Sequence, residues 1–248
     1  MDNSFSLQGK TILITGASSG IGRATAIACA SVNASVIVTG RNINRLNETL
    51  SLMTGEGHQA VAAELCDHSE ICRLVDLLPE LDGVFLCAGI TDTTLVKYMN
   101  AEAIRRVMSI NLESPMLLTQ RLLFKKKIKK GSSIVFMSSM GAEHVAPGLG
   151  IYAASKNGLN AFMKTVAAEQ ASRKVRSNAI MAGMVRTELL DTLSLLSEED
   201  LKKDAAKYPL GYGEPNDVAN AVIYLLSDAS KWMTGSVIKL DGGNSLNV

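Results

Sequence analysis

A glycine-rich turn close to the amino terminus constrains the fold of this chain more than any other feature. Thr15-Gly16-Ala17-Ser18-Ser19-Gly20-Ile21-Gly22 follows a short apolar run and opens a stretch of helical spacing. Glycines let a strand turn tightly into a helix, and they let the backbone approach a pyrophosphate at the helix amino terminus. The spacing is Gly-x-x-x-Gly-x-Gly, and no Gly-Lys-Ser/Thr follows, so a Walker-type phosphate loop is excluded. The turn predicts a dinucleotide site made by Gly16, Ser18, Ser19, Gly20, Ile21 and Gly22.

Short apolar runs alternate with longer stretches of helical spacing along the chain. The runs are typical of parallel strands buried on both faces, and they lie at Thr11–Ile14, Ser35–Val38, Gly83–Cys87, Ser133–Met137 and Ser236–Leu240. The helical stretches are Gly20–Val32, Ala101–Phe124, Ala153–Ser172 and Pro215–Leu226. The alternation predicts one α/β domain over residues 1–248, a doubly wound (Rossmann-type) parallel sheet with helices on both faces. The polar segment 187–208 is expected to form a flap over the substrate site.

Composition narrows the class of protein further. A net charge of +1 excludes a strong general field for nucleic acid or a membrane surface, so neither is an expected partner. The four cysteines form no Cys-x-x-Cys pair, which favours reduced thiols and no metal site. No apolar run is long enough to cross a membrane, and the first ten residues carry no signal-peptide pattern. We therefore expect a cytoplasmic protein.

The residues at the end of the second expected strand bear on the nicotinamide nucleotide. A site for NAD needs a carboxylate there for the adenosine ribose, whereas this chain has Thr39-Gly40-Arg41-Asn42. Arg41 can pair with a 2′-phosphate through its planar guanidinium. The sequence therefore predicts NADP(H) in preference to NAD(H). A solvated loop role for Arg41 stays open.

Tyr152 and Lys156 are one turn apart on an expected helix and so share a face. An ammonium beside a phenol favours the phenolate and lowers its pKa toward the range of acid–base catalysis. Ser139 ends an expected strand and offers a hydroxyl for a substrate oxygen. Asn111 is an amide in an apolar helical context, where it would hold a water molecule or bend the helix. Together these four residues predict proton transfer at a carbonyl or alcohol.

Over essentially its whole length the chain resembles the short-chain dehydrogenase/reductase family. The matching elements are Thr15–Gly22, Asp67, Cys87-Ala88-Gly89, Asn111, Ser138-Ser139, Tyr152 with Lys156, Asn178-Ala179-Ile180, Gly183, Thr187, Thr234-Gly235 and Asp241-Gly242-Gly243. The resemblance implies that Tyr152 is the general acid, that Ser139 polarises the carbonyl, and that Lys156 holds the nicotinamide ribose. It also implies a water-mediated proton relay from Asn111 to Lys156, and cofactor contacts from Asp67 to the adenine, from Ala88 and Gly89, and from Gly183, Val185 and Thr187.

Two positions depart from the family pattern. Cys87 replaces the usual Asn, which is expected to weaken a hydrogen bond of the sheet without touching the catalytic residues. Ala182 replaces the usual Pro before Gly183, which is expected to leave that loop less rigid.

The substrate stays open between several classes. The carboxyl-terminal pattern resembles 3-oxoacyl-carrier-protein reductases as well as sugar and polyol dehydrogenases, and a nucleotide-binding regulator without catalysis is a third alternative. The run Lys125-Lys126-Lys127-Ile128-Lys129-Lys130 is either a solvated helix end or a docking patch for an acidic carrier. His144 is interpreted as a solvated loop residue. The resemblance implies a homotetramer, with a dimer as the alternative.

Overall fold

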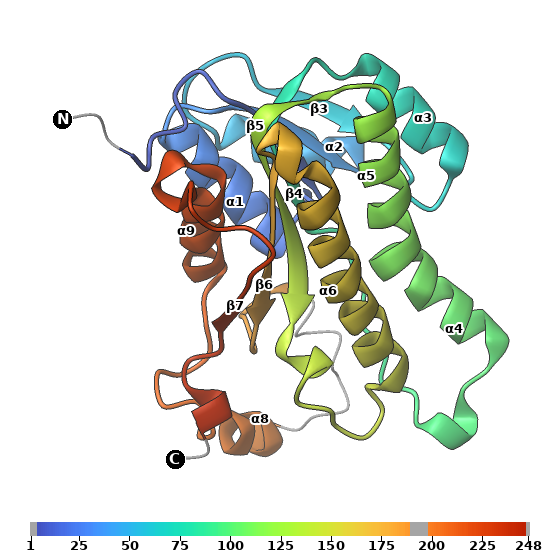
Figure 1. Ribbon diagram of the computed structural model, residues 1–248. Coiled ribbons are helices and arrows are strands. Elements are labelled where there is room, and N and C mark those ends of the chain that lie inside the picture. The colour runs from blue at the N-terminus through green and yellow to red at the C-terminus, as the bar shows by residue number, and fades with distance from the viewer. Residues whose placement is uncertain (1–3, 189–197, 247–248) are drawn as a thin grey trace.

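A seven-stranded sheet forms the centre of the molecule (Figure 1). The computed structural model describes residues 4–188 and 198–246. The strand order is β3-β2-β1-β4-β5-β6-β7, and every neighbouring pair is parallel. The strands are β1 Thr11–Thr15, β2 Ser35–Gly40, β3 Gln59–Ala62, β4 Leu81–Leu86, β5 Ile128–Ser139, β6 Arg176–Ala182 and β7 Val237–Leu240. The predicted doubly wound fold is confirmed.

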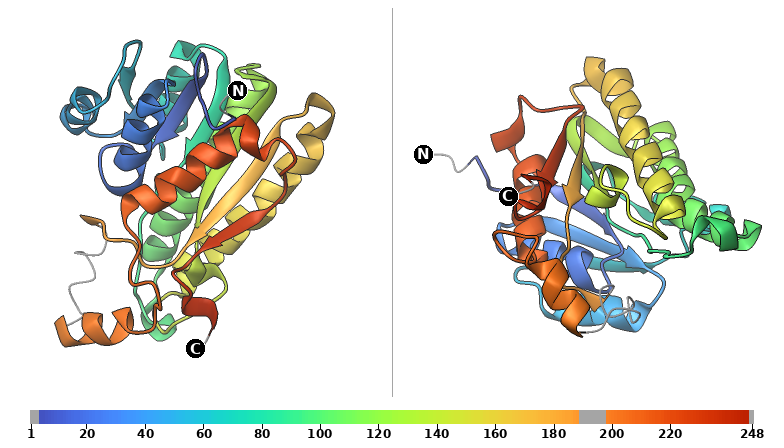
Figure 2. Two further views of the ribbon diagram at one scale, coloured as in Figure 1. Left: turned by 90° about the vertical axis from the view of Figure 1, so that its left-hand side faces the viewer. Right: turned by 90° about the horizontal axis from the view of Figure 1, so that it is seen from below.

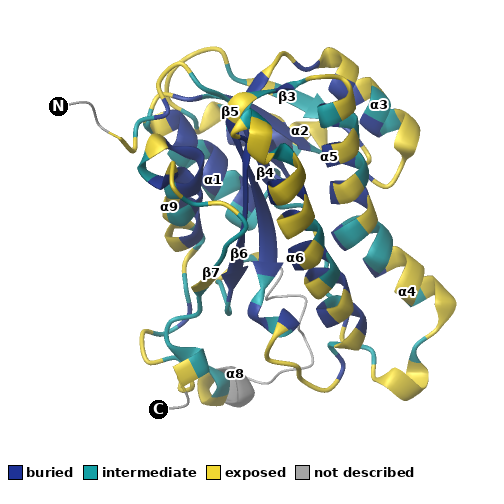
Figure 3. Cartoon of the chain, viewed as in Figure 1, coloured by how far each residue is buried: buried dark blue, intermediate teal, exposed yellow. Residues whose placement is uncertain are grey.

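Helices cover both faces of the sheet (Figure 2). They are α1 Gly20–Ser31, α2 Ile43–Ser51, α3 His68–Leu77, α4 Ala101–Met108, α5 Ser114–Phe124, α6 Gly150–Gln170, α8 Glu198–Ala205 and α9 Pro215–Leu226. One apolar core lies between the sheet and α1 and α9, and the other lies between the sheet and α3, α5 and α6. The strands between them are largely buried (Figure 3), and β1, β2 and β4 carry mostly apolar side chains.

Local capping residues set where several helices begin. The Asn42 side chain accepts the Arg45 N–H at 3.2 Å at the start of α2, and Asn100 accepts the Ala103 N–H at 2.8 Å at the start of α4. At α9 the side chains of Glu214 and Asp217 form a capping box. Such residues satisfy N–H groups that have no partner within the first turn.

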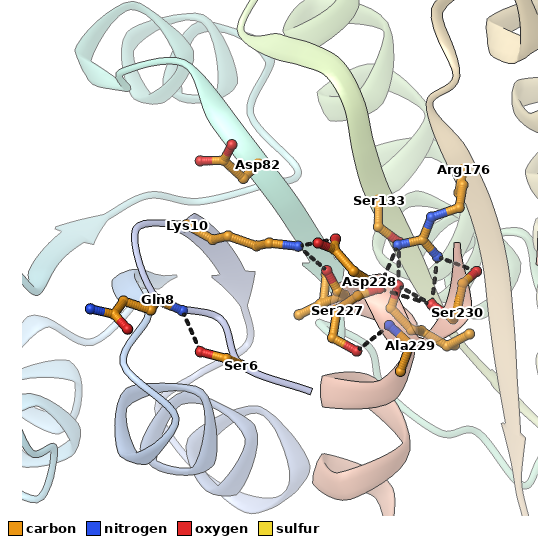
Figure 4. A network of polar contacts seen from close by, with 12 residues as sticks. Ser6, Gln8, Lys10, Asp82, Ser133, Arg176, Ser227, Asp228, Ala229 and Ser230 are labelled. Atoms are coloured by element: carbon orange, nitrogen blue, oxygen red, sulfur yellow. Dashed lines mark hydrogen bonds and ion pairs between the residues drawn. The ribbon is translucent and has the colours of Figure 1, made fainter. Parts of the chain in front are cut away.

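A buried arginine joins the start of β6 to the end of α9 (Figure 4). The Arg176 guanidinium donates to Ser230 Oγ at 2.6 Å and to the Ser227 carbonyl at 3.1 Å. Lys10 pairs with Asp228 at 2.6 Å in the same network. The network satisfies carbonyl groups at the α9 carboxyl end, beside the amino-terminal end of β6.

The structure differs from the sequence-based expectations in one helix and two strands. The helix predicted over Ala101–Phe124 is interrupted by a π-helical turn, Ser109–Glu113, between α4 and α5. The apolar pattern did not predict β3, which is an edge strand with partly exposed side chains, or β6, which begins with polar residues that are all buried. The predicted flap 187–208 falls in part on residues 189–197, which lie outside the described residues.

Candidate active site

The glycine turn connects β1 to α1 in a conformation that only small residues accept. Gly16 and Gly20 have φ values of +66° and +51°, in the left-handed region. A Cβ on Gly22 would lie 2.3 Å from the Gly16 carbonyl oxygen, and one on Gly16 would lie 2.9 Å from Ala88 Cα. The Ser19 side chain at the N-cap of α1 makes no capping hydrogen bond within the described part of the chain. The first turn of α1 is thus suited to bind an anion.

A cleft of about 810 Å³ opens at the carboxyl ends of the neighbouring strands β1 and β4. The chain continues from β1 to β2 on one side of this pair and from β4 to β5 on the other side. This switch point is where open α/β sheets bind their ligands. The cleft brings together most of the predicted site residues: Gly16, Ser18, Ser19, Gly20, Ile21, Gly22, Arg41, Ala88, Gly89, Ser139, Tyr152, Lys156, Gly183, Val185 and Thr187. Its size and its glycine-lined wall fit a dinucleotide.

The structure places Asp67 at the start of α3, and its contact with the adenine stays a prediction. Its carboxylate caps α3 by accepting the Ser69 N–H at 2.8 Å, and Asp67 does not line the cleft. These hydrogen bonds to Ser69 hold the Asp67 pKa below its usual value. Glu64 and Leu65, which lie closer to the end of β3 in the same loop, line the cleft instead. The capping pattern Asp67-His68-Ser69-Glu70 is the signal that could have revealed this role.

Arg41 lines the cleft, and an acidic side chain lies near it. Its guanidinium lies 3.9 Å from the Glu64 carboxylate, and both side chains are largely exposed. The Cys66 N–H donates to Glu64 and helps to place it. The residues at the end of β2 include no acid, but the folded chain brings Glu64 from the loop after β3 close to Arg41.

Tyr152 and Ser139 lie next to each other in the lining of the cleft. Their hydroxyls share a hydrogen bond, and Ser139 Oγ also accepts the Gly141 N–H at 3.1 Å. Tyr152 lies in the first turn of α6, and Ser139 is the last residue of β5. The two hydroxyls are therefore presented together to any group bound beside them.

The expected lowering of the Tyr152 pKa is wrong for this structure. Burial raises the Tyr152 pKa, and the hydrogen bond from Ser139 opposes that shift only in part. Lys156 lies with its Nζ 5.7 Å from the Tyr152 ring centre and donates to the Met137 carbonyl at 2.8 Å. Lys156 is itself 4% exposed, and burial lowers its pKa to about 8. At neutral pH Tyr152 therefore keeps its proton while Lys156 keeps its charge.

Cys87 lies closer to the catalytic residues than the sequence indicated. Its sulfur interacts electrostatically with both Lys156 and Tyr152, and burial raises the pKa of the thiol to about 12. The Cys87 N–H donates to Thr15 Oγ1 at 3.0 Å, which ties β4 to β1. Because the thiol is uncharged at neutral pH, the expectation that this departure leaves the catalytic residues untouched stays a prediction.

Asn111 lies where the helix between α4 and α5 changes to a π-helical turn, and its predicted roles as a helix-bending or water-holding residue stay predictions. It lies in the π-helical turn, is 1% exposed and does not line the cleft. Its Oδ1 accepts the Ile90 N–H at 2.9 Å, and its Nδ2 donates to the Ile90 carbonyl at 2.9 Å and to Ser155 Oγ at 3.2 Å. Asn111 thereby fixes the loop after β4 against α6. Its part in a proton relay stays a prediction.

The lysine run lies at the opposite end of the sheet from the cleft. Lys125 ends α5, whereas Lys129 and Lys130 belong to β5. In the pairing with β4, Ile128 lies beside Leu81 and Phe136 beside Leu86, with a bulge before Ser133, so at about 3.3 Å per residue Ile128 lies about 26 Å from Ser139. Several of the lysines are paired, as in Lys125 with Asp76 at 2.9 Å and Lys129 with Asp82 at 2.8 Å. A carrier docked on this run would be remote from the cleft of the same chain.

The loop after β5 forms the other wall of the cleft. His144, predicted to be a solvated loop residue, lines the cleft beside Val145 and Leu149. Met184 and Tyr208 face the same space from the connection that follows β6. Within the described residues, no group of three or more His, Cys, Asp and Glu side chains could hold a metal ion. That part of the chain also contains no helix long and apolar enough to span a membrane.

Comparison with known proteins agrees with this geometry. The family model described as enoyl-(acyl carrier protein) reductase matches residues 16–245. The chain is 35% identical to a 3-oxoacyl-(acyl-carrier-protein) reductase of Rickettsia felis over 238 residues, covering 96% of this chain and 97% of the relative. The chain belongs to the short-chain dehydrogenase/reductase family. It is an NAD(P)-dependent oxidoreductase.

Solved structures of this family superpose closely on the chain. A short-chain dehydrogenase/reductase from Mycobacterium ulcerans matches with a TM-score of 0.89 at 31% identity, covering 98% of this chain and 92% of that one. A Beutenbergia cavernae protein, titled as an NAD(P)-dependent gluconate 5-dehydrogenase with NADP bound at low occupancy, matches with a TM-score of 0.89 at 28% identity. The match covers 98% of this chain and 100% of that one. The family therefore includes relatives that are named for different substrates.

Proposed function

We propose that this short-chain dehydrogenase/reductase uses NADPH to reduce a ketone to a secondary alcohol. The observation that carries the proposal is the pair of hydroxyls of Tyr152 and Ser139 in the cleft, beside the buried Lys156. Bound NADPH would supply the hydride. Gly16, Gly20 and the first turn of α1 would hold its pyrophosphate, because these glycines leave room for a close approach of the backbone.

In this mechanism Tyr152 donates its phenol proton to the substrate oxygen. The raised pKa of Tyr152 keeps that proton in place at neutral pH. Because Ser139 Oγ accepts the Gly141 N–H, its own O–H can turn toward the same oxygen and stabilise the charge that develops there. Lys156 contributes a positive charge near the phenol. The Met137 carbonyl accepts a hydrogen bond from the Lys156 ammonium and so holds that charge in position.

Arg41 supports the preference for NADPH. It lines the cleft directly after β2, where the adenosine ribose of a dinucleotide lies in this fold. The bound NADP of the Beutenbergia cavernae relative supports the same cofactor. Glu64 beside Arg41 opposes the binding of a phosphate, so the preference depends on the balance of these two charges.

Arg41→Ala is expected to raise the KM for NADPH about tenfold and to leave the KM for NADH nearly unchanged, since NADH has no 2′-phosphate. The measurement is initial rates with each cofactor at a fixed ketone concentration. Equal effects on both cofactors would contradict the assignment of Arg41 to the 2′-phosphate.

For the substrate we propose a 3-oxoacyl thioester. The similarity to the Rickettsia felis reductase and the apolar side chains of Met140, Val145 and Leu149 along the cleft support it. A keto sugar or polyol is the second candidate, supported by the gluconate dehydrogenase relative and by the polar His144 and Asn244 in the same cleft. The position of the lysine run gives no support to carrier docking at the cleft of the same chain.

The experiment that tests the function measures oxidation of NADPH and NADH by the purified protein with an acetoacetyl thioester, a keto sugar and a simple diketone. Turnover with NADPH and the thioester supports the proposal, whereas a preference for the keto sugar replaces it with the second candidate. Tight NADPH binding without turnover on a wide range of carbonyls would instead support a regulator that has lost catalysis.

The homotetramer and the cytoplasmic location stay predictions. Trp232, which is 99% exposed beside β7, and the exposed Met116 and Phe124 of α5 are apolar side chains that a subunit contact would cover.

A further inference from the structure

A second arginine, Arg45, does not itself line the cleft but pairs with a carboxylate that does, Glu188. Arg45 lies in the first turn of α2, the helix that begins directly after Arg41, and its guanidinium meets Glu188. Glu188 lines the cleft and follows Thr187, whose methyl group lies 3.2 Å from the place a Cβ of Gly20 would take. The pair therefore connects the adenosine end of the cleft with the segment over the glycine turn.

The contact between Arg45 and Glu188 is close but is not a fork-to-fork pair. Both carboxylate oxygens of Glu188 lie 2.6 Å from the same nitrogen, Nη2 of Arg45. An arginine binds a carboxylate or phosphate best with two nitrogens, each donating to a different oxygen. The two side chains are 39% and 58% exposed, and an ion pair this exposed to water contributes little free energy and separates readily.

The remaining charges at this end of the cleft leave Arg45 as the cation best placed to change partners. Arg23 is held inside the protein by the Ser18 carbonyl at 2.6 Å and by Thr49 Oγ1 at 3.1 Å. Arg41 lies 3.9 Å from Glu64, whereas Arg45 has Glu188 on its guanidinium and the Glu48 carboxylate nearby on the same helix. These carboxylates offset the positive charges of Arg41 and Arg45, so a phosphate that binds here has to compete with them.

We propose that Arg45 is a second determinant of NADP(H) binding and that Glu188 competes with the 2′-phosphate of the cofactor for its guanidinium. This inference rests on the NADPH preference proposed above. A dianionic phosphate takes two donor nitrogens of Arg45 in place of the single-nitrogen contact with Glu188. Glu188 thus sets how strongly the cleft distinguishes NADP(H) from NAD(H), and its carboxylate lowers that selectivity.

The test compares two small probes that differ only in the 2′-phosphate, adenosine 2′,5′-bisphosphate and adenosine 5′-monophosphate. Their dissociation constants are measured by calorimetry for the wild type, Arg45→Gln, Glu188→Gln and the double variant. Arg45→Gln is expected to weaken the bisphosphate about tenfold, and Glu188→Gln to tighten it about threefold, with the monophosphate unchanged in both. In the Arg45→Gln background, Glu188→Gln is expected to have no further effect.

Glu70→Gln is the matched control, because Glu70 makes an exposed pair with Arg73 at 2.7 Å on α3 and does not line the cleft. Equal changes for both probes, or no change in either variant, would overturn the role of Arg45. A wild type that binds the two probes equally would instead overturn the NADPH preference. Even then, a preference for the bisphosphate that appears only in Glu188→Gln would support the competition. Unfolding temperatures of all variants show whether any loss of binding is a loss of fold.

Discussion

Tyr152→Phe is expected to lower kcat for ketone reduction by about 10³-fold and to leave the dissociation constant of NADPH close to that of the wild type. The phenol of Tyr152 lines the cleft, and its hydrogen bond with Ser139 would place it beside the oxygen of a substrate that Ser139 also contacts. Phenylalanine keeps the ring packed at the start of α6, so the cleft keeps its shape. The measurement is single-turnover and steady-state reduction with NADPH, combined with binding of NADPH followed by its fluorescence.

The pH dependence separates this role from a structural one. Burial raises the pKa of Tyr152, so the protonated donor persists through neutral pH, and the rate of reduction should not increase as the pH rises. Alcohol oxidation needs the phenolate and should therefore become faster with rising pH. The Phe variant should lose this second dependence.

Tyr224→Phe, on the distant helix α9, is the matched control and should behave like the wild type. A Tyr152→Phe variant with more than a tenth of the wild-type kcat would contradict the role of Tyr152 as proton donor.

The sequence predicted the parts of the site that depend on local geometry. The glycine turn, the Tyr152 and Lys156 pair and the end of β5 at Ser139 all depend on a short stretch of chain, and all of them line the cleft. The alternation of apolar runs predicted the parallel sheet for the same reason, because strands buried on both faces have almost no polar positions. The edge strand β3 escaped this pattern because its side chains are partly exposed.

Properties that depend on distant residues could not be predicted in this way. Glu64 approaches Arg41 from the loop after β3, and Glu188 reaches Arg45 from 143 positions along the chain. The direction of the Tyr152 pKa shift depends on how fully the surrounding loops exclude water, which no spacing of residues reports. Asp67 was assigned to the cofactor because it follows β3, whereas the start of α3 uses its carboxylate as a cap.

Lys156→Met is expected to abolish most of the activity and at the same time to stabilise the protein. Lys156 is 4% exposed, and its pKa falls from 10.5 to about 8 because burial disfavours the ammonium. At about 1.36 kcal/mol per pKa unit, holding the charge inside the protein at pH 7 costs about 3 kcal/mol, and losing the hydrogen bond to the Met137 carbonyl returns about 1 kcal/mol of that gain. Methionine should therefore raise the free energy of unfolding by about 2 kcal/mol, and the melting temperature by about 4–8 °C.

The pH dependence of this stabilisation follows from the two pKa values. Below about pH 8 both the folded and the unfolded wild type carry the proton, so the cost of burial is present in full. Between about pH 8 and 10.5 the unfolded chain still binds the proton while the folded protein does not, so wild-type stability rises with pH and the advantage of the Met variant shrinks. Lys164→Met, an exposed position on the same helix, should leave both activity and melting temperature unchanged. If Lys156→Met melts at a lower temperature than the wild type at pH 7, the prediction is wrong, because the buried ammonium would then stabilise the fold.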